Sequence, residues 1–424
     1  MGQPNSSHSP QGVTLHFSRR AVVLLLLVLL GPWLVLGVYY AIDISSEPAQ
    51  TTPKPTPQNG ESVTVCAPGP WGNLEYVRIL TEPPELQVVS NFPNVDHATW
   101  FFQGYTATDL DVLWQSAGLS PAEIAIINQP ELRKTVGDTI TLRAPKSFVL
   151  GLSPTARNAI YTALATFSQN PAQAEPYRFT ASARGDWFKD SGLEPETIAR
   201  VERLLYQRGN SLLFSDQAFV IPPLNSLEES TRLLKTLARK STLMLKLRIN
   251  PDTDVEALEQ YWNFPGSKDI VPLLNSLKRR GTSTTVDIVH LLPRFARSLI
   301  YTYPSPEEAG STTYMDCHWT VLNFFNSEPD PRYQDIDQVA LAFRTEYHPV
   351  TGRPRYGDIY LFTQPNGNVI HSCVYIADNI VFTKNGASPS SPWMLMKYED
   401  VVAFYPSHQP LDIQRYRPNF TKKN

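Results

Sequence analysis

The stretch GDIYLFTQPNGNVIHSCVYIADNIVFTK, residues 357–384, decides the fold that the sequence predicts for the C-terminal part of the chain. Its apolar runs are 359–362, 369–377 and 380–384. The Pro-Asn-Gly-Asn and Asp-Asn segments between them are turn signals, so the runs are typical of antiparallel strands joined by short loops. We interpret 401–405 as a fourth strand and 317–326 as a helix before the sheet. One helix followed by such strands predicts an α+β domain.

Composition excludes several classes of protein. The 424 residues carry 37 basic and 40 acidic side chains, so the formal net charge is −3. This balance gives no support for binding nucleic acid, which requires a basic surface. The three cysteines are too few for a disulfide framework, and no Cys-x-x-Cys pair indicates a zinc knuckle. Because metal-binding and nucleotide-binding motifs are also missing from the sequence, we expect no metal and no cofactor.

The N-terminal segment indicates export. Residues 21–42 are uncharged and mostly apolar, which is long enough to cross a bilayer. The arginines before this run and the acidic residues after it predict a cytoplasmic tail at 1–20 and the remaining chain outside the cytoplasm. The Pro-rich segment 43–65 reads as a linker. We predict a single-pass signal anchor in the cell membrane; the alternative is a signal peptide cleaved near Gly37, which would release a secreted protein.

Residues 66–289 are expected to form a mainly helical, mixed accessory region of unknown role. Helix starts are indicated at Ser120, Ser153, Pro195 and Ser226. Strand-like runs occur at 139–143, 212–221 and 243–249. The α+β domain is then expected at 290–410, followed by a C-terminal tail at 411–424.

Cys317 and His371 form the candidate catalytic pair. Cys317 directly follows Asp316, which is suited to cap the expected helix. Backbone N–H groups at a helix start favour a thiolate and can hold an oxyanion. His371 lies on an expected strand and supplies a candidate base. A cysteine and a histidine far apart in sequence and close in space are the expected arrangement in a thiol hydrolase.

The order of these residues resembles the NlpC/P60 superfamily of cysteine peptidases. The matching segments are Asp316-Cys317, Gly357-Asp358 and His371-Ser372-Cys373-Val374-Tyr375-Ile376. The resemblance covers roughly residues 300–406 and implies a papain-like domain with Cys317 as nucleophile and His371 as base. It also implies a cell-wall peptide as the typical substrate. The Ser-Gly that follows the family's cysteine is replaced by His318-Trp319, which places bulk beside the nucleophile and makes His318 a possible second acid or base.

In this family a third polar group on the next strand holds the imidazole. An ungapped count reaches Thr383, and Asn385 lies two positions further. A three-residue loop after Ala377 would place both on the side of His371, whereas a two-residue loop would place Lys384 there. We predict Asn385, because a side-chain amide serves this purpose in papain-like proteases, with Thr383 as the alternative.

The sequence thus predicts an exported, membrane-anchored cysteine hydrolase with the triad Cys317, His371 and Asn385. The expected reaction is cleavage of an amide bond in cell-wall peptide, of the peptidoglycan endopeptidase or amidase type. The expected partners are the membrane and this peptide substrate, and no nucleic acid. The alternatives are a non-enzymatic envelope protein that uses a cysteine-peptidase-like domain for binding or scaffolding, and the same dyad acting on another acyl substrate.

Overall fold

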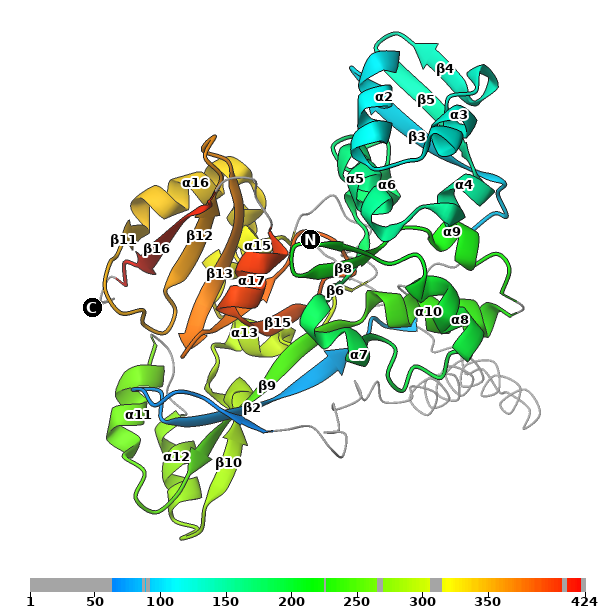
Figure 1. The fold of residues 1–424 in the computed structure, drawn as a ribbon. Helices are drawn as coiled ribbons and strands as arrows, with labels where there is room; N and C mark the ends of the chain where they lie inside the picture. The colour runs from blue at the N-terminus through cyan, green and yellow to red at the C-terminus, as the bar shows by residue number, and fades with distance from the viewer. Residues whose placement is uncertain are drawn as a thin grey trace, which may run out of the picture. The chain divides into compact units, whose positions relative to one another are not determined.

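Antiparallel sheets and the helices packed on them make up the structure, a computed structural model of the chain (Figure 1). It describes residues 63–85, 88, 92–224, 226–264, 270–305, 315–405 and 410–420. Over these residues the fold is α+β, as the sequence predicts, and every pair of neighbouring strands in a sheet is antiparallel. The predicted membrane segment, 21–42, lies outside the described residues. Among the residues that are described, no helix combines the length and apolar character needed to cross a bilayer.

The largest sheet contains most of the stretch 357–384, whose apolar runs predict antiparallel strands. Its strands, in spatial order, are β11 (Tyr347–Pro349), β16 (Asp412–Pro418), β12 (Ile359–Thr363), β13 (Val369–Ala377), β14 (Ile380–Lys384) and β15 (Trp393–Lys397). The three strands expected between 359 and 384 are therefore confirmed as β12, β13 and β14. The tail predicted at 411–424 is wrong in part, because β16 pairs along the whole of β12.

A buried charge cluster explains why β16 joins the sheet. Asp358 is fully buried and accepts hydrogen bonds from Arg417 Nε at 2.6 Å and from Nη2 at 2.8 Å. Arg415 Nε lies 3.3 Å from the same carboxylate. A buried carboxylate needs such partners, so Asp358 ties the start of β12 to β16. The preceding Gly357 has a φ of 86°, and a Cβ there would lie 2.2 Å from the ring of Phe325. The Gly-Asp pair is thus required by local packing.

The fourth strand predicted at 401–405 is wrong. The strand is instead β15, and 401–404 lie in helix α17 (Tyr398–Phe404). The five residues of β15 alternate between two apolar sides of the sheet and pair with β14 along its full length. Glu399 and Asp400 fall in the first turn of α17, where acidic side chains favour a helix.

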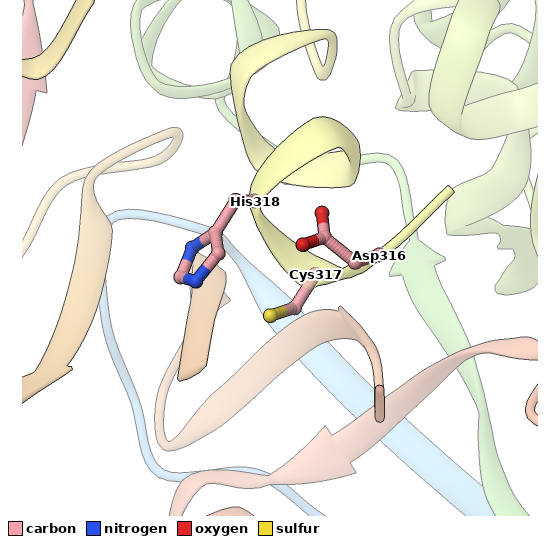
Figure 2. Close-up of side chains that lie close together, drawn as sticks. All are labelled: Asp316, Cys317 and His318. Carbon is pink, nitrogen blue, oxygen red and sulfur yellow. The ribbon is translucent and has the colours of Figure 1, made fainter. Parts of the chain in front are cut away.

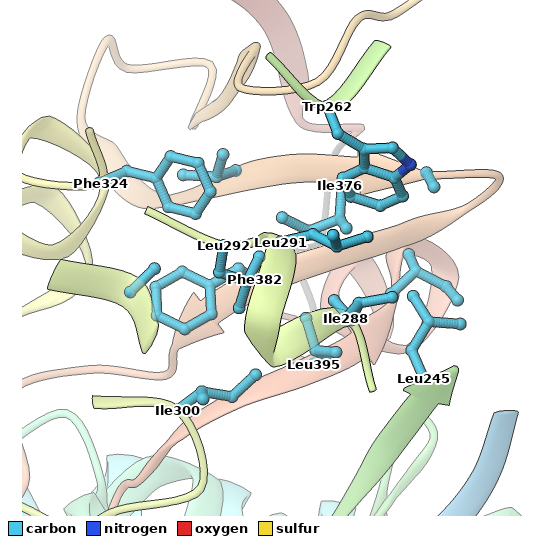
Figure 3. Close-up of a cluster of buried hydrophobic side chains, with 14 of the residues drawn as sticks. Leu245, Trp262, Ile288, Leu291, Leu292, Ile300, Phe324, Ile376, Phe382 and Leu395 are labelled. Atoms are coloured by element: carbon cyan, nitrogen blue, oxygen red, sulfur yellow. The ribbon is translucent and has the colours of Figure 1, made fainter. Parts of the chain in front are cut away.

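Helix α15 (Cys317–Leu322) begins at the candidate nucleophile and is shorter than the predicted 317–326 (Figure 2). It packs on β13 and β14 over the largest apolar core. That core joins residues from both sides of the boundary predicted at 289 and 290, for example Trp262 and Leu245 with Phe324 and Ile376 (Figure 3). The region before residue 290 therefore contributes to the core beneath α15.

Successive residues of the central strands face opposite sides of the sheet. Val374, Phe382 and Leu395 face the core shared with α15. Cys373 and Val381 face a smaller apolar cluster that also contains Val401 of α17. We refer to these two sides as the α15 face and the α17 face.

Among the described residues, three further sheets lie before residue 290, and β1 (Thr64–Val65) falls in the last two residues of the predicted linker. Their strands are β1, β2 (Asn73–Thr81), β9 (Lys240–Ile249) and β10 (Thr284–Asp287); β3 (His97–Gln103), β5 (Thr139–Pro145) and β4 (Arg133–Val136); and β6 (Tyr177–Thr180), β8 (Ser211–Phe214) and β7 (Tyr206–Arg208). The strand runs predicted at 139–143 and 243–249 are confirmed. The run at 212–221 is wrong beyond Phe214, because it continues into a short helix at Gln217–Val220.

The helices of the described residues include the four whose starts the sequence indicates. They are α2 (Ala107–Ser116), α3 (Pro121–Ile127), α4 (Lys146–Gly151), α5 (Pro154–Leu164), α6 (Pro171–Ala174), α7 (Arg184–Trp187), α8 (Pro195–Glu202), α9 (Gln217–Val220), α10 (Leu227–Ala238), α11 (Val255–Trp262), α12 (Ile270–Lys278), α13 (Arg294–Leu299) and, after α15, α16 (Ile336–Thr345). Ser120, Ser153 and Ser226 each accept a hydrogen bond from a backbone N–H in the first turn, as N-caps do.

Candidate active site

Cys317 occupies the first position of α15, and Asp316 is the N-cap. The Asp316 Oδ1 accepts a hydrogen bond from the N–H of Trp319 at 2.8 Å, which fixes the start of the helix. Only 4% of Cys317 is exposed. The helix is held on the sheet by its apolar residues and by the Trp393 indole, which donates to Thr320 Oγ1 at 3.0 Å. The thiol is thus placed at the positive end of a firmly packed helix.

His371 is fully buried on β13, on the α17 face. Its ring stacks on Tyr405 with ring centroids 4.4 Å apart, and the Phe362 ring lies edge-to-face with it at a centroid distance of 5.3 Å. The Nε2 atom lies 3.1 Å from Thr383 Oγ1. The Nδ1 atom is buried and has no hydrogen-bond partner in the part of the chain that the structure describes.

The hydrogen bonds around Thr383 determine which nitrogen of His371 carries the proton. Thr383 donates its hydroxyl hydrogen to Asn385 Oδ1 at 3.2 Å. A hydroxyl has one hydrogen, so the Thr383 oxygen must accept from the Nε2–H of His371. The neutral ring then has its lone pair on the unpartnered Nδ1. A ring nitrogen with such a lone pair can act as a base.

Asn385, the residue predicted to hold the His371 imidazole, does not contact the ring directly; Thr383 lies between them. Thr383, the alternative, contacts His371 directly, and Asn385 contacts Thr383 and the sulfur of Met396. The loop after Ala377 has two residues, and an irregularity between Tyr375 and Ala377 restores the side-chain alternation. Sequence reasoning missed this bulge, which keeps Thr383 on the side of His371 despite the shorter loop.

Lys384 lies on the other side of β14 and was not predicted to have a role. It is fully buried, and its Nζ donates to the carbonyl oxygens of Gly386 at 2.8 Å and Ser388 at 3.1 Å. Burial lowers the pKa of Lys384 to about 8, while the nearby negative charges of Cys317 and Asp316 act in the opposite direction. A buried cation thus lies near the start of α15. The alternation of β14 was the signal that could have pointed to it.

His318 extends from α15 to the same side as the sulfur of Cys317 (Figure 2). Its Nδ1 lies 2.9 Å from Ser372 Oγ on β13. Burial lowers the pKa of His318, against the opposing effect of Asp316. One potential ligand atom each from Asp316, Cys317 and His318 lie within 4.8 Å of one another. Such a set suits zinc by chemistry, although Asp316 Oδ1 already caps the helix.

Cys317 begins α15, which packs on the α15 face, whereas His371 lies on the α17 face of β13. No hydrogen bond joins them among the described residues. A negative charge on Cys317 would add to the larger effect of burial in raising the pKa of Cys373 and of Tyr405. Cys373 lies two residues from His371, and Tyr405 stacks on its ring. The thiol therefore lies within electrostatic range of both neighbours of the imidazole.

The other two cysteines are in environments that disfavour a thiolate. Burial and the charge of Asp378 raise the pKa of Cys66 to about 11, against a smaller effect of Lys397. Burial raises the pKa of Cys373 well above its usual value. Thiols of this kind react slowly at neutral pH. They provide internal references for the reactivity of Cys317.

Comparison of the chain with family models, with curated proteins and with solved structures finds no match.

Proposed function

We propose that this protein is an exported, membrane-anchored cysteine hydrolase that cleaves an amide bond in cell-wall peptide. The observation that carries the proposal is the hydrogen-bond chain from His371 Nε2 through Thr383 to Asn385, which leaves a base lone pair on a buried, unpartnered Nδ1. The ordered resemblance to NlpC/P60 peptidases supports the same assignment and is the basis for the papain-like fold and the substrate. The predicted N-terminal anchor supports the location.

In this proposal His371 Nδ1 takes the proton of Cys317, and the sulfur attacks the carbonyl carbon of the amide. The N–H groups at the start of α15 stabilise the resulting oxyanion. His371 then gives its proton to the departing amine, leaving an acyl group on the sulfur. Water, deprotonated by the same nitrogen, attacks this thioester and releases the carboxylic acid, and the thiol is restored. Thr383 acts as a positioning residue that holds the required tautomer, in the place predicted for Asn385.

The test compares the full-length wild-type protein with Cys317→Ala on purified peptidoglycan, by counting newly released amino groups. We expect hydrolysis by the wild type and a loss of at least about 1,000-fold in the variant, because the nucleophile is removed. A Cys66→Ala variant is the matched control and should keep full activity. Hydrolysis retained by Cys317→Ala would exclude this nucleophile, and the absence of wild-type hydrolysis would exclude this substrate.

A non-enzymatic binding or scaffold protein is the second candidate. The observation that favours it is the closure of the site: His371 is fully buried, Cys317 is 4% exposed and His318 is 6% exposed. A substrate carbonyl therefore reaches the thiol only if neighbouring side chains move. Slow modification of Cys317, equal to that of Cys66, would support this candidate over the hydrolase.

A further inference from the structure

A cavity of about 250 Å³ adjoins the candidate active site. Asn385 and Tyr405 line it, and these are the residues that touch Thr383 and the His371 ring. Its opposite wall comes from the accessory region and includes Arg178 of β6 and Lys240 of β9. Figure 1 shows α17 beside β6, where the Arg178 guanidinium donates to the carbonyl oxygen of Phe404.

The two cations of this cavity lack acidic partners. Lys240 Nζ donates to the carbonyl oxygen of Arg178 at 3.1 Å, and the Arg178 guanidinium lies 4.2 Å from the centroid of the Phe404 ring. Within the described ranges, neither side chain forms an ion pair. Asp400 also lines the cavity, but its carboxylate lies 3.7 Å from Arg78. Glu175, the other acidic residue of the wall, is exposed.

Holding two cations in a partly dehydrated cavity is costly unless an anion completes the site. Burial lowers the pKa of Lys240 to about 8, and the charge of Arg178 adds to this effect. An ammonium has three N–H donors and a guanidinium has five, so both retain donors for a ligand. A carboxylate carries a single negative charge and accepts charge-assisted hydrogen bonds from both groups.

We propose that this cavity binds a carboxylate group of the substrate through Lys240 and Arg178. The carboxylate would anchor the substrate so that a neighbouring amide bond lies beside Tyr405 and Cys317. This assignment of the bond rests on the proposed hydrolase function, whereas the carboxylate site itself does not. It gives the accessory region a role in selecting acidic peptides.

Binding is measured with the full-length Cys317→Ala protein, so that the result does not depend on hydrolysis. The probes are glutarate, its neutral analogue glutaramide, and inorganic phosphate, each followed by ligand-observed NMR titration. We expect glutarate to bind at least tenfold more tightly than the other two. Equal binding of glutaramide would overturn the charge requirement, and tighter binding of phosphate would overturn the assignment to a carboxylate.

Substitutions locate the site. Lys240→Met and Arg178→Met should each weaken glutarate binding at least tenfold. Lys246→Met, on the same strand and outside the cavity wall, is the matched control and should leave binding unchanged. Lys240→Gln keeps a polar side chain and gives the same test if Lys240→Met lowers the thermal midpoint. Unchanged binding in the cavity variants would contradict the proposal. Glutarate binding without peptide hydrolysis by the wild type would support the carboxylate site and contradict the hydrolase function. Hydrolysis without glutarate binding would support the hydrolase function and contradict the carboxylate site.

Discussion

A histidine lies on each side of the largest sheet, His318 on helix α15 and His371 on strand β13, and the two have different surroundings. On the α15 face, His318 has its Nδ1 engaged with Ser372, above the largest apolar core. On the α17 face, His371 is bound on Nε2 by Thr383 and has its Nδ1 unpartnered. The first arrangement uses the ring to fix a helix on a sheet. The second leaves a nitrogen without a partner, and this nitrogen is the base in the proposed reaction. His318 is closer to Cys317 in the sequence than His371 is.

The largest expected effect is a difference in hydrolysis rate between variants of these two histidines. His371→Ala should lower the rate of peptide hydrolysis by about 1,000-fold, within the range for loss of a general acid–base group. His318→Ala should lower it less than tenfold. Both rates are measured as release of amino groups, with folding checked by thermal unfolding. A larger loss in His318→Ala than in His371→Ala would reverse the comparison and make the α15 face the catalytic one.

The next effect concerns the hydrogen-bond chain on the α17 face. Thr383→Val keeps the shape and removes the acceptor for the His371 Nε2–H, so hydrolysis should fall by roughly 10–100-fold. In Asn385→Ala the hydrolysis rate should fall by only a few fold, because Asn385 contacts Thr383 and not the His371 ring. The ratio of kcat/KM values measures this difference. Equal losses would show that the amide, as the sequence predicted, supports the histidine directly.

The buried Lys384 lies on the α15 face, and its environment can be tested by measuring how the free energy of unfolding changes with pH. Its pKa is lowered to about 8 by burial, so the unfolded chain binds more protons than the folded chain between about pH 8 and 10.5. The free energy of unfolding should therefore rise with pH in this window. From pH 7.5 to 9.5 its contribution is roughly 1–2 kcal/mol, from the size of the shift.

Lys384→Met should remove the contribution of Lys384 to the rise in the free energy of unfolding between about pH 7.5 and 9.5, as measured by urea unfolding at these two pH values. Lys240 contributes in the same direction and remains in the variant. Lys189→Met, at an exposed position, is the control and should keep the wild-type slope. An unchanged slope in Lys384→Met would contradict the buried, charge-disfavouring environment of this lysine.

The smallest expected effect is that of a chelator. Asp316, Cys317 and His318 could hold a metal, but the proposed reaction uses the sulfur as nucleophile. EDTA treatment should therefore change the hydrolysis rate less than twofold. A loss that added zinc restores would instead assign the α15 face to metal chemistry.

The strands around the site were predictable because turn residues separate apolar runs of regular length. The bounds of β13 and β14 match the sequence prediction residue by residue. Strand β16 was missed because its partners are distant in sequence: the reason for its position is the buried Asp358, paired with Arg417. The α17 helix was mistaken for a strand because Val401–Tyr405 is apolar throughout, and the pairing of β15 with β14 is a tertiary contact.

In the candidate site, the helix start at Cys317 follows from a local rule, because Asp316 is suited to cap the helix. The placement of Thr383 on the side of His371 depends on an irregularity in β13 that no single residue of the sequence indicates. The cavity with Lys240 and Arg178 was beyond sequence reasoning. Its walls join residues between 174 and 241 to residues between 385 and 405, more than a hundred residues further along the chain, and each lysine or arginine alone is typical of a surface charge.

The most direct test is the rate at which iodoacetamide alkylates each cysteine at pH 7, followed by mass spectrometry of the full-length protein. Cys66 is 7% exposed and Cys317 is 4% exposed, so exposure alone predicts that Cys66 reacts at least as fast. If Cys317 works with His371, Cys317 should react at least tenfold faster than Cys66 and Cys373. His371→Ala should bring it to the rate of Cys66, and His318→Ala should not. Equal slow rates for all three thiols in the wild type would contradict a catalytic Cys317.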